Sequence, residues 1–110
     1  MNPLIMKALG SGAALQVAMV VIGHFLSPDQ QSLLFPIVGT LLGGVTGWMA
    51  GPSSPTASGR AANGAVTGGV AGALGSLMST SLGDAPLSNI AIAGGATVVS
   101  GAVGALLRRR

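Results

Sequence analysis

The sequence predicts an all-α membrane protein in which four transmembrane helices form two helical hairpins. The first observation behind this prediction is the scarcity of charge, since 49% of the 110 residues are hydrophobic and only 6% are charged. A soluble domain carries about 25% charged residues, so this chain lacks the polar coat that water requires. The second observation is that the uncharged stretches are about 20 residues long, the length typical of membrane spans.

The third observation is the order of the charges along the chain. The basic residues are Lys7, Arg60, Arg108, Arg109 and Arg110, and the acidic residues are Asp29 and Asp84. Four crossings would place every basic residue on one side of the membrane and both acids on the other, which is the positive-inside pattern. We therefore expect both termini to be cytoplasmic, in a multi-pass protein of the bacterial inner (cytoplasmic) membrane.

The chain is predicted to form a single transmembrane domain over residues 1–110. Its parts are hairpin 1 (4–50), a linker (51–60), hairpin 2 (61–107) and a basic tail (108–110). The four predicted spans are Leu4–Leu26, Ser32–Ala50, Ala61–Leu82 and Leu87–Leu107. The first span has the outline of a signal peptide, but we expect it to be retained as a helix of the bundle.

The sequence is also compatible with an internal duplication. Residues 10–14 match 62–66 at an offset of 52, and residues 39–47 match 96–104 at an offset of 57. Small residues are common in this chain, so chance also produces such matches. A real repeat would be parallel, with its pseudo-axis along the membrane normal.

Small residues recur at a spacing of four, in the manner of a glycine zipper. The positions predicted to pack helices are Gly39, Gly43, Gly47, Gly64, Gly68, Gly72 and Gly101. At this spacing the residues of one span share a helix face, and glycine lets two backbones approach closely inside a bilayer. Such faces either hold the chain's own bundle together or dock another copy or another subunit.

The third span is unusually poor in large apolar side chains, because serine, threonine and glycine fill much of it. It would insert weakly by itself. We therefore expect it at the centre of the bundle or at a subunit interface, with the first and second spans facing lipid.

Catalysis finds little support, because the chain has no glutamate and no cysteine and its two aspartates fall in turns, where aspartate is common. We expect no enzyme, no metal site and no catalytic residue. His24, near the end of the first span, is the candidate cofactor residue, since imidazole can ligate a haem iron or the magnesium of a chlorophyll-type pigment. The alternative is an interfacial histidine with an ordinary hydrogen bond. Gln16 is expected to donate a hydrogen bond between helices.

Several residues are predicted to fix the position of the bundle in the membrane. Trp48 is typical of the membrane interface, and the basic residues at one side orient the chain. The tail of three arginines is expected to contact anionic lipid headgroups. Nucleic acid is not an expected partner, because no basic face or aromatic platform is present.

Residues Leu33–Gly51, with the run Pro36–Gly44 followed by Gly47, resemble small glycine-zipper membrane proteins of the transglycosylase-associated type. That family is usually shorter and has three spans. The resemblance implies a small integral membrane protein and carries over no functional residue.

The leading functional hypothesis is a non-enzymatic accessory or structural subunit that docks into a larger membrane assembly through small-residue helix faces. Its expected partners are the lipid bilayer and other membrane subunits or further copies of itself as an oligomer. A second hypothesis is a holin-like oligomeric pore former. A third is a cofactor-binding subunit that uses His24.

Overall fold

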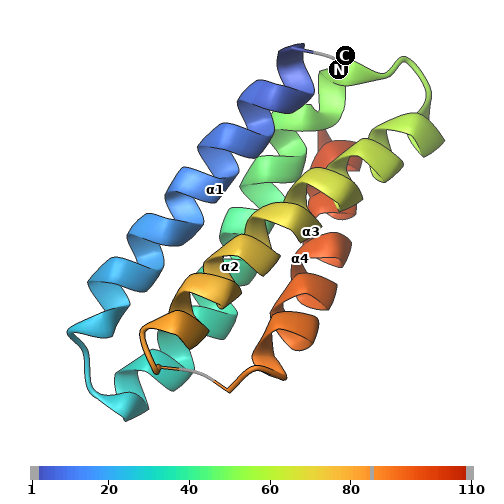
Figure 1. The fold of residues 1–110 in the computed structure, drawn as a ribbon. Helices are drawn as coiled ribbons and strands as arrows, with labels where there is room; N and C mark the ends of the chain where they lie inside the picture. The colour runs from blue at the N-terminus through green and yellow to red at the C-terminus, as the bar shows by residue number, and fades with distance from the viewer. Residues whose placement is uncertain (1–2, 85, 109–110) are drawn as a thin grey trace.

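The computed structural model describes residues 3–84 and 86–108, which form an elongated bundle of antiparallel helices (Figure 1). The helices are α1 (Pro3–His24), α2 (Pro28–Ala50), α3 (Ala57–Ser81) and α4 (Asn89–Leu107), with a short 3-10 helix, η1 (Gly51–Ser53), between α2 and α3. The all-helical prediction is confirmed. The principal extents of the bundle are 43 × 20 × 19 Å.

Two helices begin earlier than predicted because their capping residues act as helix starts. Ser27 and Gln30 form a capping box, with Ser27 Oγ accepting from Gln30 N at 3.3 Å and Gln30 Oε1 accepting from Ser27 N at 3.1 Å. Pro28 occupies the first helical position, where proline is favoured. The second span therefore begins at 28 rather than 32.

The predicted linker 51–60 is also shorter than expected. Thr56 Oγ1 accepts a hydrogen bond from Gly59 N at 3.1 Å and caps α3, which begins at Ala57 rather than at 61. Gly51–Ser53 continues from α2 as a 3-10 turn. Of the predicted linker 51–60, only residues 54–56 lie outside helices.

The end of α3 is closed by a Schellman motif. Gly83 adopts a positive φ of 80°, a conformation that glycine reaches without steric cost. Gly83 N donates to Thr80 O at 3.0 Å, and Asp84 N donates to Ser79 O at 2.9 Å. This motif turns the chain toward α4 and fixes the position of Asp84.

The helices α2 and α3 form the central pair of the bundle. Each of them packs against all the other α-helices, whereas α1 and α4 do not contact each other within the described chain. The prediction of a central third helix is confirmed by these contacts. The buried face of α3 is made of small or hydroxylated residues: Gly64, Thr67, Gly68, Gly69, Ala71, Gly72, Gly75, Ser76 and Ser79.

Large apolar side chains lie on the outside of the bundle and polar ones lie inside. The buried polar residues are Gln16, Thr46, Thr67, Ser76, Ser79 and Thr97. All four helices expose large apolar side chains, for example Ile22, Leu41, Val66 and Ile92. A soluble monomer rarely shows so extensive an apolar surface, so this distribution is consistent with a membrane protein.

Three segments are long and apolar enough to cross a membrane: α1, residues 28–53 and α4. The third predicted span, which corresponds to α3, is not among them. Of the four predicted spans, three are therefore long and apolar enough to cross a membrane. The exception is α3, because its small and hydroxylated residues lower its mean hydropathy.

The predicted packing glycines lie at the contacts between helices, and all seven are buried. A Cβ atom on Gly47 or Gly64 would overlap the carbonyl oxygen of Gly101 across the helix contact. A Cβ on Gly43 or Gly72 would collide with the side chain of Thr97. Most of these glycines thus join α2 and α3 to α4 within one chain.

Gly39 is the exception among these positions. A Cβ there would lie 3.5 Å from Met19 Cε, an ordinary van der Waals distance. Close backbone approach therefore does not require glycine at Gly39 in this bundle.

We predict that Gly68→Leu prevents correct assembly of the bundle, whereas Val45→Leu is tolerated. A Cβ on Gly68 would lie 2.5 Å from Thr97 O and 3.2 Å from Gly43 O, and neither backbone can yield. Overpacking at such a site costs about 3 kcal/mol. Val45 is 45% exposed on the outer surface. Folded yield and resistance to unfolding by SDS in mixed micelles measure the difference, and equal values for the two variants would contradict the packing argument.

Candidate functional site

A cavity of about 410 Å³ lies between the helices at one end of the bundle. At the opposite end, α2 contacts α4 through Gly47 and Gly101, and Gly51 of η1 lies against Ala105 of α4. Toward the aspartate end, residues 28–40 of α2 and 89–97 of α4 line the cavity instead. The cavity therefore marks where these two helices no longer pack tightly together.

The inner wall of the cavity includes a hydrogen bond between α1 and α2. The side chain of Gln16 is buried, and its Nε2 donates to Gly39 O at 3.0 Å. This contact confirms the prediction that Gln16 donates between helices. A Cβ on Gly75 would lie 2.8 Å from Gln16 Cβ, so glycine in α3 makes room for the glutamine.

A second polar contact joins α3 to α4 along the cavity wall. Asn89 Nδ2 donates to Ser76 Oγ at 3.2 Å, and Ser76 Oγ donates to Asn89 O at 3.3 Å. Both residues line the cavity. This reciprocal pair fixes the first turn of α4 against α3.

Ser79 is a buried polar residue of the cavity wall whose side chain lacks a hydrogen-bond partner within the described chain. It is 2% exposed, and its Oγ has no hydrogen-bond partner among the residues that the structure describes. An unsatisfied buried hydroxyl destabilises the folded state by about 1–3 kcal/mol. Ser79 Oγ is enclosed in the cavity wall and has unused hydrogen-bonding capacity.

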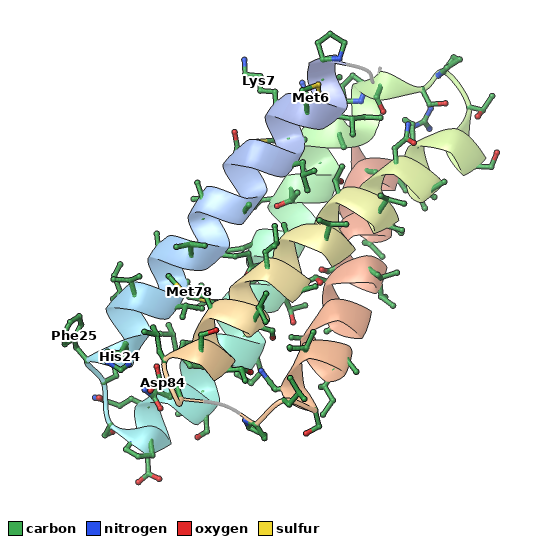
Figure 2. All side chains as sticks on the ribbon, viewed as in Figure 1. Met6, Lys7, His24, Phe25, Met78 and Asp84 are labelled. Carbon is green, nitrogen blue, oxygen red and sulfur yellow. The ribbon has the colours of Figure 1, made fainter. Side chains whose placement is uncertain are left out.

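Asp84 lines the same cavity and is paired with His24. Asp84 Oδ2 lies 2.7 Å from His24 Nδ1, and the two side chains are 11% and 39% exposed, respectively. Figure 2 shows the two residues together at one end of the bundle, opposite Lys7. The pair ties the end of α1 to the turn between α3 and α4. Among the described residues that line the cavity, Asp84 is the one with an ionisable side chain.

His24, the predicted cofactor residue, is thus oriented by a carboxylate. Histidine ligands of metals commonly have such a carboxylate partner on the second ring nitrogen, but so do histidines with a purely structural role. The described residues contain no cluster of three or more His, Cys, Asp or Glu that could hold a metal ion. A haem or chlorophyll-type pigment at His24 stays a prediction.

The predicted topology anchors gather at the end opposite Asp84. The guanidinium of Arg108 lies 4.0 Å from the ring centroid of Trp48, and its Nη1 donates to Trp48 O at 3.3 Å. Arg60 Nη1 donates to Pro55 O at 3.2 Å, and Lys7 is exposed on α1. The predicted anchors Arg109 and Arg110 lie outside the described residues.

Comparison with protein-family models, with curated proteins and with solved structures finds no match to this chain. The resemblance of residues 33–51 to transglycosylase-associated glycine-zipper proteins therefore stays a prediction. Sequence reasoning did not identify Ser79 or Asn89 as site residues. The available signal was the spacing of Ser76 and Ser79, which places two hydroxyls on one face of α3.

We predict that Gln16→Met weakens the bundle by about 0.6 kcal/mol, the average contribution of a hydrogen bond between membrane helices. Methionine keeps the length of the side chain and removes the donor to Gly39 O. Leu15→Met, one position away on an exposed surface, is the matched control and should behave as the parent. The SDS concentration at half-unfolding measures the effect, and an unchanged midpoint for Gln16→Met would show that this hydrogen bond adds no stability.

Proposed function

We propose that this chain is a non-enzymatic integral membrane protein that crosses the bilayer four times and serves as an accessory subunit of a larger membrane assembly. The observation that carries the proposal is an exposed face of small residues on α1, formed by Gly10, Ala14 and Ala18. This face is left free while the glycines of α2, α3 and α4 pack against each other.

The fourth crossing is supported by the outer surface of α3. Its 25 residues span about 37 Å at about 1.5 Å per residue, more than the about 30 Å of a bilayer core. The exposed stripe Val66, Val70, Leu74 and Leu77 is wholly apolar. The polar residues of α3 that lower its hydropathy, such as Thr67 and Ser76, are buried against the other helices. Lipid would therefore meet an apolar surface.

The short connections between helices also favour a role within the membrane. The described chain outside α-helices consists of residues 25–27, 51–56, 82–84, 86–88 and 108. These segments are too short to form an aqueous domain, so a partner that docks on the bundle must meet mainly its lipid-facing helices. The basic residues at the end shared by Lys7, Arg60 and Arg108 would be cytoplasmic by the positive-inside rule.

The small-residue face of α1 has the spacing that membrane helices use for close association. Gly10, Ala14 and Ala18 recur every four residues and therefore lie on one side of the helix. A Cβ on Gly10 would meet nothing within 4 Å, so no part of the described chain covers that position. A shallow groove between α1 and α3, lined by Ala14, Leu77 and other residues, continues this face. A transmembrane helix of another subunit can approach closely here.

The fourth crossing predicts opposite labelling of two single cysteines. The parent chain has no cysteine, so Ser54→Cys and Leu87→Cys each introduce one thiol, before and after α3. We expect a membrane-impermeant maleimide added to whole cells to label Leu87→Cys and to leave Ser54→Cys unlabelled until the cells are opened. Labelling of both sites from the same side would show that α3 does not cross.

The accessory role predicts that a bulky residue on α1 separates this protein from its partner. Ala14→Leu should reduce the recovery of stoichiometric partner subunits in mild detergent by about tenfold, which corresponds to a loss of about 1.4 kcal/mol of binding free energy. Ala14 is exposed, so the variant should remain folded. Val99→Leu on the exposed surface of α4 is the matched control and should retain the partners.

Two results would contradict the accessory role. Recovery of the parent protein as a homo-oligomer alone, together with growth arrest and membrane depolarisation on overexpression, would favour the holin-like pore former. Equal recovery of partners by Ala14→Leu and the parent would show that docking does not use the α1 face.

A further inference from the structure

We propose that the cavity at the aspartate end of the bundle binds a small amphipathic amine, with the ammonium group at Asp84 and Ser79 and the apolar part between α2 and α4. This inference concerns ligand binding by the bundle itself and does not depend on a partner subunit.

The size and lining of the cavity suit a small organic ligand. Its volume of about 410 Å³ falls within the range of about 300–1,000 Å³ usual for ligand sites. The apolar lining includes Met19, Val20, Phe35 and Ile92, from three different helices. A few polar groups in a mainly apolar wall are the usual means of orienting such a ligand.

The charge of the lining selects a cation. Asp84 supplies a carboxylate, and none of the described lining residues is a lysine or an arginine. His24, which does not line the cavity, lies with its Nδ1 2.7 Å from Asp84 Oδ2. A carboxylate has two oxygens and about four acceptor sites, so this contact leaves capacity for an ammonium donor. A positive ligand would thus find a partner in the wall, whereas an anion would be repelled.

Ser79 provides the second, independent observation. Its hydroxyl is buried and without a partner among the described residues, and Ser79 belongs to the cavity wall. Asp84 N donates to Ser79 O at 2.9 Å, so the Schellman motif at the end of α3 holds the two residues close together. An ammonium group has several N–H donors. After a small rearrangement of the wall that uncovers the enclosed serine hydroxyl, it would satisfy the hydroxyl and the carboxylate together.

Two kinds of molecule in a membrane carry an ammonium group beside an apolar body. One is a free amphipathic amine, and the other is the headgroup of an aminophospholipid such as phosphatidylethanolamine. Both would place a positive nitrogen at Asp84 beside an apolar body. Lipid composition separates them experimentally.

The test uses the full-length protein in phosphatidylcholine nanodiscs and a matched pair of probes, 4-phenylbutylamine and 4-phenylbutanol. Binding is measured by equilibrium dialysis and corrected for partition into discs without protein. We expect the amine to bind about tenfold more tightly than the alcohol, because a hydrogen bond between charged groups contributes more than one from a neutral hydroxyl. Equal affinity for amine and alcohol would overturn the proposal.

Asp84→Asn and Asp29→Asn form a matched pair of variants. Asparagine at position 84 retains an acceptor for His24 but removes the charge, so the preference for the amine should disappear. Asp29 lies in the first turn of α2 at the same end of the bundle and is not part of the lining. Asp29→Asn should keep the preference, and an equal loss in both variants would show a general surface potential rather than a site.

Ser79→Ala separates binding from folding. Removal of an unsatisfied buried hydroxyl should leave the SDS unfolding midpoint unchanged or higher, while amine affinity falls severalfold. Unchanged amine affinity in this variant would remove Ser79 from the site and contradict the proposed geometry.

Discs that contain phosphatidylethanolamine identify the source of the ammonium. A lower apparent affinity for 4-phenylbutylamine in these discs would mean that the lipid headgroup competes for the site. An unchanged affinity would identify the free amine as the ligand. Failure of every probe to bind would reject the cavity proposal and leave the accessory role untouched, because that role is tested by partner recovery.

Discussion

The structure depends on the contact of α4 with α2 and α3 at Gly101. The backbone of Gly101 occupies the space that side chains on Gly47 and Gly64 would need, so three helices meet with almost no side chain between them. Inside a bilayer the lipid tails are as apolar as leucine, and burial of apolar side chains gives little drive for helices to associate. Close backbone packing must supply that attraction instead, which explains why this part of the chain is rich in glycine.

Tight packing at one end has a consequence at the other. The glycine contacts between α2 and α4 lie toward the end that carries Arg108, and beyond Gly43 the two helices line a cavity rather than each other. The polar residues of the cavity wall include Gln16 of α1 and Ser76 and Ser79 of α3. Its charged residue, Asp84, is held by a backbone motif and by His24. The polar chemistry of the bundle is therefore concentrated in a region bounded by well-fixed elements.

The same distribution separates the polar and the apolar side chains of the helix with low hydropathy, α3. The hydroxyls of Thr67 and Thr97 bond to backbone carbonyls within their own helices, and both residues are buried. The exposed surface of α3 includes the stripe Val66, Val70, Leu74 and Leu77. Average hydropathy treats every residue alike, whereas the bilayer interacts only with the outer surface of the bundle. The bundle also leaves the small-residue face of α1 exposed.

The sequence by itself determined the helical class, the number of helices and the separation of the charges at opposite ends, because hydropathy, charge and glycine spacing act locally along a helix. It did not determine the helix starts at Pro28 and Ala57, since Ser27 and Thr56 serve equally as turn residues and as caps. The tertiary structure alone brought His24 to Asp84, 60 positions away, and left Ser79 without a partner in a cavity wall. These features depend on how helices distant in the sequence pack against one another, and no local pattern encodes those contacts.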